Sequence, residues 1–231
     1  MAKKFLFCDV DATLIRVESM GSFHDYWFNF WLPSKRAGQK IDYEDITTIM
    51  HTLTRLGASP KELSQRYYDY FSQKQATDIR VCAEDWFAHV SKNKAKFWIK
   101  ESYNELRRLR SMGVEPVLVS SSLSEIMAPI ARSLDIQHVL PARLLRPGER
   151  LQHRPLSSEI HNDAKAIAIM FFLEEQCVSE TDCYAMGNNI SDIPMLELVG
   201  HPIAMIGAPA LAIQARRRGW RTIRLSRPTT N

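Results

Sequence analysis

Two carboxylates stand two residues apart, Asp9 and Asp11, directly after the apolar run of residues 5–8. Burying two like charges at a strand end is costly unless a cation compensates them. Their oxygen atoms suit Mg²⁺. An ionised aspartate is also a nucleophile toward phosphorus, with the second carboxyl as its acid and base. A turn in which both side chains bond backbone groups explains the motif equally well.

Ser120 and Lys165 are the next candidates, in this case for binding an anion. Ser120 follows the strand expected over residues 115–119, where its hydroxyl, Ser121 and backbone amides could hold a phosphate oxygen. Lys165 stands near the start of an apolar helix expected over residues 163–176, where the helix dipole disfavours a cation. Taken alone, each has a simpler explanation, as a turn serine and as a solvated first-turn lysine.

A polar turn from Gly187 to Asp192 follows the strand expected over residues 183–186. The glycine permits a tight turn. Asn188 and Asp192 offer oxygen atoms to a metal or hydrogen bonds to neighbouring groups. Asp192 is alternatively the N-cap of the next helix, which has Pro194 in its first turn.

These candidates stand where strands are expected to end, so the strands must position them. From residue 98 onward short apolar strands alternate with helices, which predicts an α/β fold with a parallel sheet and helices on both faces. Ser122 to Glu125 has the pattern of a capping box that starts a helix ending at Ser133. In such sheets ligands bind at the carboxyl ends of the strands. The strands are expected at residues 5–8, 115–119, 138–145, 183–186, 202–205 and 222–225, and the other helices of this region at 103–112, 163–176, 193–199 and 210–218.

A helical insertion separates the first strand from the rest. Residues 17–97 are rich in aromatic residues and helix signals and hold no convincing strand. Residues 59–62 have the pattern of a capping box with proline at the first helical position. The aromatic side chains of residues 23–31 are expected mostly to fill the core of this insertion. The predicted organisation is a core of residues 1–16 and 98–231, and a cap of residues 17–97.

The order and topology of these motifs resemble the haloacid dehalogenase (HAD) superfamily of phosphohydrolases. That family has a DxDxT strand end, a serine or threonine strand end, a lysine and a GDxxxD turn. The insertion after the first motif resembles the type C1 cap of the phosphoserine-phosphatase-like branch, subfamily IB. The resemblance implies a Rossmann-like parallel sheet with an inserted α-helical cap domain. The matching residues are Asp9, Asp11 and Thr13, then Ser120, then Lys165, then Gly187, Asn188 and Asp192.

The resemblance also implies a role for each residue. Asp9 would be the nucleophile that forms an aspartyl-phosphate, and Asp11 would protonate the leaving alcohol and then activate water. Thr13 would support the loop. The ligands of the phosphoryl group would be Ser120, Ser121 and Lys165, and Mg²⁺ would be held by Asp9, the carbonyl of Asp11 and Asn188, with Asp192 orienting its water shell.

The chain departs from the family pattern at several positions. Asn188 stands where the family has aspartate, and an amide oxygen can bind Mg²⁺ but brings no charge. The expected result is weaker metal binding or impaired catalysis. Ala12 replaces a frequent glycine, and the usual glycine just before the motif lysine is absent.

The predicted function is a Mg²⁺-dependent phosphatase for a small phosphomonoester, phosphoserine or a related phosphorylated metabolite. Glu18 lies nine residues after Asp9, a spacing at which phosphoserine phosphatases contact the amino group of their substrate. An exposed glutamate at the start of the cap is the alternative. An impaired phosphate-binding HAD-like protein and a phosphotransferase are the alternative functions.

The amino-acid composition limits the classes of binding partner that we expect. The 231 residues are 45% apolar with a net charge of +4, which excludes disorder and does not point to nucleic acid or a membrane. The basic run of residues 216–218 is expected to be a solvated helix end. The apolar run before Asp9 is too short for a signal peptide, and free thiols suit a reducing compartment. We therefore expect a cytoplasmic monomer or homodimer.

Overall fold

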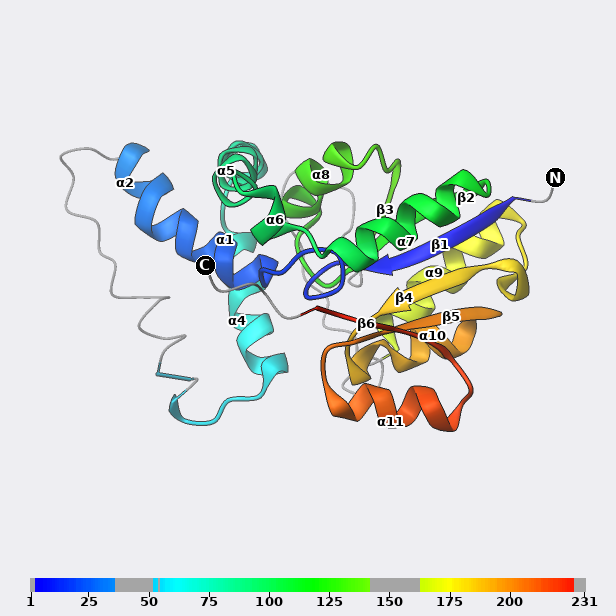
Figure 1. Cartoon of the computed structure of the whole chain (residues 1–231). Helices are drawn as coiled ribbons and strands as arrows, with labels where there is room; N and C mark the ends of the chain where they lie inside the picture. The colour runs from blue at the N-terminus through cyan, green and yellow to red at the C-terminus, as the bar shows by residue number, and fades with distance from the viewer. Residues whose placement is uncertain (1–2, 36–51, 54, 142–162, 227–231) are drawn as a thin grey trace.

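The computed structural model describes residues 3–35, 52–53, 55–141 and 163–226 (Figure 1). The strands are β1 (Lys4–Asp9), β2 (Val114–Ser120), β3 (His138–Pro141), β4 (Tyr184–Gly187), β5 (His201–Ile206) and β6 (Arg221–Arg224). The helices before β2 are α1 (Ser19–Tyr26), the π-helical η1 (Trp27–Trp31), α2 (Leu32–Lys35), α4 (Pro60–Ser72), α5 (Ala76–Val90), α6 (Lys94–Phe97) and α7 (Lys100–Ser111). Those after β2 are α8 (Ser124–Ser133), α9 (Ala164–Gln176), the 3₁₀ turns η2 (Glu180–Asp182) and η3 (Ile190–Asp192), α10 (Ile193–Leu198) and α11 (Pro209–Arg217).

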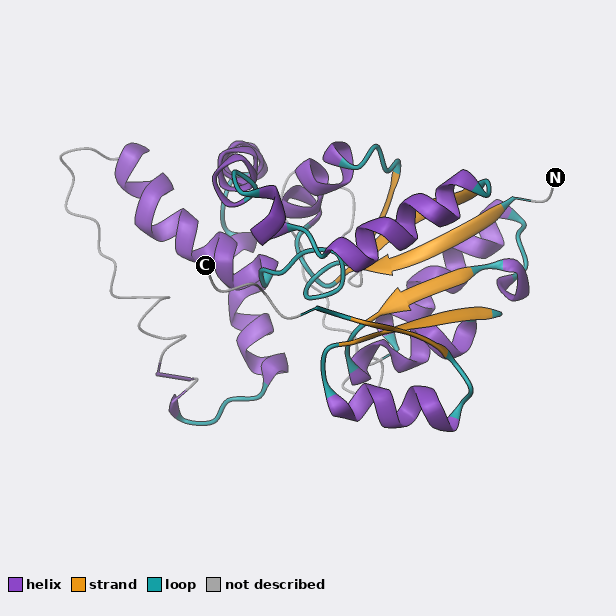
Figure 2. Ribbon diagram, viewed as in Figure 1, coloured by secondary structure: helices purple, strands orange, loops and turns teal. Residues whose placement is uncertain are grey.

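The described strands form one parallel sheet in the order β3-β2-β1-β4-β5-β6. The chain moves outward from β1 to β3 on one side and from β4 to β6 on the other, so the direction of winding reverses between β1 and β4. In Figure 2 both strands point toward the same end of the sheet, where the insertion lies. This reversal is the place where doubly wound sheets bind their ligands.

Two apolar cores cover the two faces of the sheet. Leu6 and Cys8 of β1 pack on the face covered by α7 and α8. Phe5 and Phe7 enter the opposite core, formed with α9, α10 and α11. A strand buried on both faces must be apolar throughout, which is why this run lacks the alternation of a half-exposed strand. The predicted α/β fold with a parallel sheet is confirmed.

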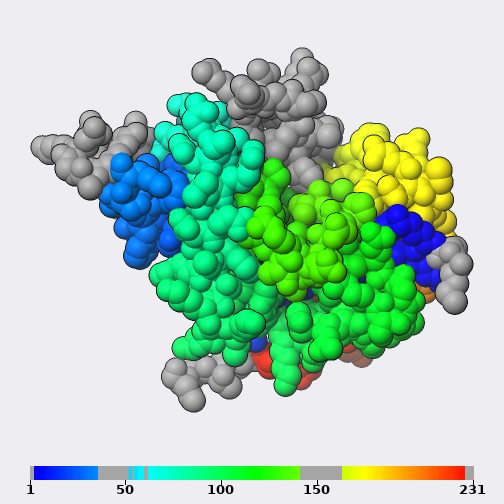
Figure 3. Space-filling model, turned by 90° about the horizontal axis from the view of Figure 1, so that it is seen from above, coloured from blue at the N-terminus to red at the C-terminus, as the bar shows by residue number. Residues whose placement is uncertain are grey.

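The described helices from α1 to α6, here called the cap helices, add no strand to the sheet. Their core is aromatic, with Phe30 an exception at 54% exposed, so the aromatic run is mostly buried as predicted. Helix α5 rests on α8 of the core, and Figure 3 shows the two surfaces side by side. The largest buried aromatic side chains of the cap helices are Phe23, Trp27, Phe28, Trp31, Tyr67, Phe71 and Trp86.

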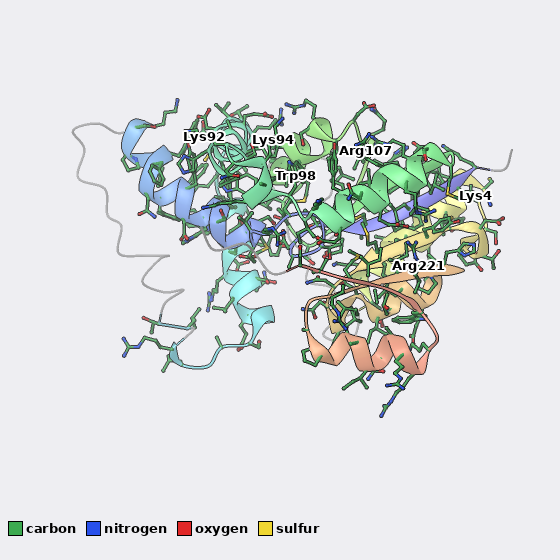
Figure 4. The ribbon with its side chains drawn as sticks, in the orientation of Figure 1. Lys4, Lys92, Lys94, Trp98, Arg107 and Arg221 are labelled. Carbon is green, nitrogen blue, oxygen red and sulfur yellow. The ribbon has the colours of Figure 1, made fainter. Side chains whose placement is uncertain are left out.

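The chain enters and leaves the cap helices through two paired segments. The backbone N–H of Arg16 donates to the carbonyl of Phe97 at 2.8 Å, and that of Ile99 donates to Leu14 at 2.9 Å. Between them Ile15 and Trp98 form an antiparallel bridge, and Figure 4 places Trp98 at this junction. We propose that this pairing marks the boundary between a core of residues 1–16 and 98–231 and a cap of residues 17–97.

Most elements follow the predictions, and the difference lies at the start of one helix. The capping box at Ser59 and Glu62 is confirmed. The one expected from Ser122 to Glu125 is wrong, because α8 begins at Ser124 and its N-cap, Leu123, has no side-chain bond to offer. The strand expected over residues 138–145 is present as β3 as far as Pro141, and residues 142–145 lie outside the described residues. No helix among the described residues is long and apolar enough to cross a membrane.

Candidate active site

Lys165 contacts two carboxylates of the candidate site, each located at or just beyond the end of a different strand. It lies in the first turn of α9, and its Nζ is 2.5 Å from Oδ1 of Asp9 and 2.6 Å from Oδ1 of Asp192. Asp9 ends β1 and Asp192 lies just beyond β4, so the lysine spans the point where the winding reverses. Its side chain is only 13% exposed. Lys165 is therefore directed at an anionic centre and is not a solvated first-turn residue.

Burial and ion pairing act in opposite directions on the pKa values of Asp9 and Lys165. Burial raises the pKa of Asp9 to about 6, although Lys165 works in the opposite direction. Burial also disfavours the charge on Lys165, but Asp9 and Asp192 outweigh it and raise the pKa of the lysine. The lysine therefore stays charged at neutral pH and can neutralise a bound anion.

Asp11 is turned toward the start of α1. Its Oδ1 accepts a hydrogen bond from the backbone N–H of Ser19 at 3.2 Å, and its Oδ2 accepts one from the Ser19 hydroxyl at 2.9 Å. Burial first, and then the charges of Asp9 and Glu18, raise the pKa of Asp11 to about 7. A carboxyl group that titrates near neutral pH can both donate and accept a proton.

Asp192 organises the turn after β4 as well as binding the lysine. Its Oδ2 accepts the backbone N–H groups of Asn188 and Asn189, each at 3.0 Å. It precedes α10 but makes no side-chain capping bond to that helix. The amide oxygen of Asn188 accepts a hydrogen bond from Thr13 at 3.0 Å, which ties the turn to the loop after β1.

Gly187 is needed for a different reason from the one predicted. It is not among the described glycines with positive φ, so the turn does not demand its conformational freedom. A Cβ at this position would instead lie 2.7 Å from both Cβ and Oδ2 of Asp192. The absence of a side chain makes room for the aspartate beside Lys165.

Three consecutive serines, beginning with the last residue of β2, have different surroundings. Ser120 is buried at the strand end, and its hydroxyl accepts the backbone N–H of Ser122 at 3.0 Å. Ser121 is exposed. The hydroxyl of Ser122 is buried without a hydrogen-bond partner among the described residues. The side chain expected to cap α8 is thus a free donor close to Ser120.

Glu18 caps a helix in this structure. Its Oε2 accepts the backbone N–H of Gly21 at 2.6 Å, which makes it the N-cap of α1. The side chain is exposed, at the point where the chain enters the cap helices. Recognition of a substrate amino group by Glu18 remains a proposal.

The contact between Ser19 and Asp11 was not predicted. No motif spacing signals it, because it depends on how the loop after β1 folds back on α1. The nearest hint in the sequence is that the helix-rich insertion was expected to begin at residue 17, and the N-terminus of a helix offers free N–H groups.

Comparison with known proteins places these features in a family. The model of the haloacid dehalogenase-like hydrolases matches residues 6–197. A probable phosphatase of Mycobacterium tuberculosis is 24% identical over 233 residues, covering 99% of this chain and 78% of that protein.

Solved structures share the fold. A protein of unknown function from Bordetella pertussis has a TM-score of 0.74 at 20% identity, covering 96% of this chain and 99% of that one. A phospho-aspartyl intermediate analogue of phosphoserine phosphatase has a TM-score of 0.56 at 16% identity, covering 93% and 91%. The predicted resemblance is thereby confirmed: the chain belongs to the haloacid dehalogenase-like hydrolase family and is similar to its phosphoserine phosphatases.

Proposed function

We propose that this hydrolase is a Mg²⁺-dependent phosphatase that cleaves a small phosphomonoester through an aspartyl-phosphate on Asp9. The observation that carries the proposal is the buried contact of 2.5 Å between Lys165 and Asp9. It places a permanent cation against the one carboxylate that would accept the phosphoryl group. The relatives that are phosphatases support the same reaction.

The residues account for both halves of this reaction. A carboxylate oxygen of Asp9 attacks phosphorus, the bond from phosphorus to the ester oxygen breaks, and Asp11 donates its proton to the leaving alcohol. Asp11 then takes a proton from water as that water attacks the phosphoryl group, which releases phosphate and restores Asp9. Lys165 neutralises the phosphoryl oxygens in both steps, with Ser120 as a further ligand.

The oxygen atoms present fit Mg²⁺ when the substrate completes the site. Asp9, the carbonyl of Asp11 and the amide of Asn188 are hard oxygen donors of the kind Mg²⁺ prefers, and we propose that Asp192 supports its water shell. Among the described residues no group of three His, Cys, Asp or Glu side chains could hold a metal by itself. When bound, Mg²⁺ would supply charge neutralisation of the transferring group.

For the substrate we propose phosphoserine or a related phosphorylated metabolite, with Glu18 as the partner of an amino group. The four cysteines are free thiols, three of them buried, which favours a cytoplasmic location. We propose a monomer or homodimer that binds neither nucleic acid nor a membrane.

The test is a phosphate-release screen over phosphorylated metabolites and an aryl phosphate, with and without Mg²⁺. Asp9→Asn is expected to lower the rate by at least about 1000-fold, because the nucleophile is lost. Asp182→Asn, an equivalent change at an exposed aspartate near Lys4, is the control and should leave the rate unchanged. An Asp9→Asn protein as active as the wild type would refute the assignment.

Asn188 favours a second candidate, a phosphate-binding protein with little catalytic power. The uncharged amide weakens the metal site, while Asp9, Asp11 and Lys165 keep the binding features. A phosphotransferase would use the same intermediate with an acceptor alcohol in place of water. Product analysis in the presence of alcohols separates transfer from hydrolysis.

A further inference from the structure

Tyr67 in α4 carries a buried hydroxyl that the fold leaves unused. The residue is 2% exposed, and its hydroxyl oxygen has no hydrogen-bond partner among the described residues. A buried polar group in this state costs about 1–3 kcal/mol, so such groups are rare in folded proteins.

Neighbouring tyrosines show that this is not general in the cap helices. The hydroxyl of Tyr70 accepts a hydrogen bond from Nε1 of Trp27 at 3.3 Å. The hydroxyl of Tyr68 lies 3.6 Å from the sulfur of Met20. Tyr67 differs from both, although its ring is well packed, with its centroid 4.7 Å from that of Phe71.

The position of Tyr67 relates it to the candidate site through α1. Ser19, the first residue of α1, binds the Asp11 carboxylate. His24, five residues further along the same helix, has its ring centroid 6.4 Å from that of Tyr67. The tyrosine therefore packs on the helix whose first residue holds the proposed acid.

Burial keeps the Tyr67 hydroxyl in its protonated form. Burial raises the pKa of Tyr67 well above its usual value, and negative charges on Tyr68, Glu18 and Asp11 add to the effect. Two of these groups, Glu18 and Asp11, belong to the proposed substrate site. The hydroxyl therefore keeps its proton and is available as a donor.

We propose that Tyr67 is a specificity-determining residue, whose hydroxyl donates a hydrogen bond to an acceptor oxygen on the alcohol portion of the phosphomonoester. The proposal rests on the proposed phosphatase function. Because the hydroxyl is enclosed, the group that meets it must be enclosed with it beneath the cap helices. A substrate whose alcohol carries a carboxylate, carbonyl or hydroxyl oxygen would supply the missing acceptor, while a plain aryl or alkyl phosphate would not.

The test compares Tyr67→Phe with the wild type on two substrates. One is the best substrate found among phosphoserine, glycerol phosphate and sugar phosphates, and the other is phenyl phosphate, whose leaving group has no second oxygen. The ratio of kcat/KM for the first over the second is expected to fall about 10- to 100-fold, as loss of one substrate hydrogen bond predicts. Most of the change should appear in KM.

Thermal stability supplies a second readout. Since the hydroxyl has no partner in the described state, Tyr67→Phe should keep or raise the Tm of the ligand-free protein. The control is Tyr70→Phe, which removes a hydroxyl that has a partner. It should lower Tm and leave the ratio of the two substrates unchanged.

The outcomes separate this inference from the function on which it rests. If the wild-type protein hydrolyses no phosphomonoester, the phosphatase itself is refuted. If the wild type is active and Tyr67→Phe changes both substrates equally, or changes neither, only the role of Tyr67 is overturned. A fall in Tm as large as that of Tyr70→Phe would also overturn it, because the hydroxyl would then have a structural partner.

Discussion

At the scale of single residues, the carboxylates of the candidate site outnumber its cations. Asp9 and Asp192 share one cation, Lys165, and Asn188 adds an oxygen without adding charge. An aspartate at position 188 would place a third carboxylate close to the other two. Such clusters are unfavourable until a cation enters.

Asn188→Asp is therefore expected to act in opposite directions with and without metal. In EDTA the added negative charge should lower Tm by a few degrees. With Mg²⁺ the affinity for the metal should rise about 10-fold or more and the rate should increase. Metal titrations followed by Tm and by phosphate release check both effects. A variant with unchanged metal affinity would count against an impaired natural site.

Asp11 predicts how stability depends on pH. Its pKa in the folded protein is about 7, above its ordinary value, so between about pH 4 and 7 the folded state binds more protons than the unfolded state. This contribution to stability is present at low pH and is lost as the pH rises through 7. In metal-free buffer the Tm of Asp11→Asn should therefore be higher than that of the wild type at pH 8. At pH 5 the difference between the two Tm values should be much smaller. Parallel changes in both proteins at the two pH values would contradict the assignment.

Sequence order was enough to predict which residues stand at the strand ends. Asp9, Ser120 and Lys165 follow from their places after strands or in a first helical turn. The bonds of Ser19 to Asp11 and the isolation of the Tyr67 hydroxyl could not be predicted. The first depends on how the loop after β1 folds against α1 and the second on how α4 packs on α1, and no local periodicity encodes that packing.

At the scale of elements, close approach matters as much as turn conformation. Gly187 ends β4 where the side chain of Asp192 returns against the backbone. Gly187→Ala should displace Asp192 from Lys165 and lower activity about 10- to 100-fold, with some loss of Tm. Gly207 is a matched control, since its nearest side-chain neighbour, Leu225, would lie 3.6 Å from a new Cβ. Equal activity of the two variants would contradict this account.

The capping-box pattern predicted one helix start correctly and another wrongly, and the difference has a physical reason. At Ser59 the serine and Glu62 bond each other's backbone, and the helix starts as predicted. From the last residue of β2 three serines stand in a row, so the pattern fits more than one starting point for the helix. Ser120 takes the backbone N–H of Ser122, which fixes the strand end and moves the helix start to Ser124.

At the scale of the whole molecule, an ion pair fastens the last strand to the core. The two terminal guanidinium nitrogens of Arg221 in β6, Nη1 and Nη2, donate to the buried carboxylate of Glu105 in α7 at 2.5 and 2.9 Å. Together with Arg108, this arrangement lowers the pKa of Glu105 to about 2 against the effect of burial. Figure 4 shows Arg221 on the strand beside α7.

Arg221→Ala should therefore lower Tm by several degrees, because it deprives a buried carboxylate of a bidentate partner. Arg224→Ala, at an exposed position of the same strand, is the control and should change Tm little. Thermal melts at neutral pH make the comparison. If Arg224→Ala were as damaging, the loss would belong to the strand and not to the ion pair.

The pairing of Ile15 with Trp98 has a consequence for chain topology. Because Arg16 and Phe97 are hydrogen-bonded neighbours, a two-residue hairpin turn could join these two segments in place of the insertion. Helix α7 still provides the crossover between the parallel strands β1 and β2. The strand order of the sheet therefore does not depend on the insertion, whose length could change without rerouting a strand.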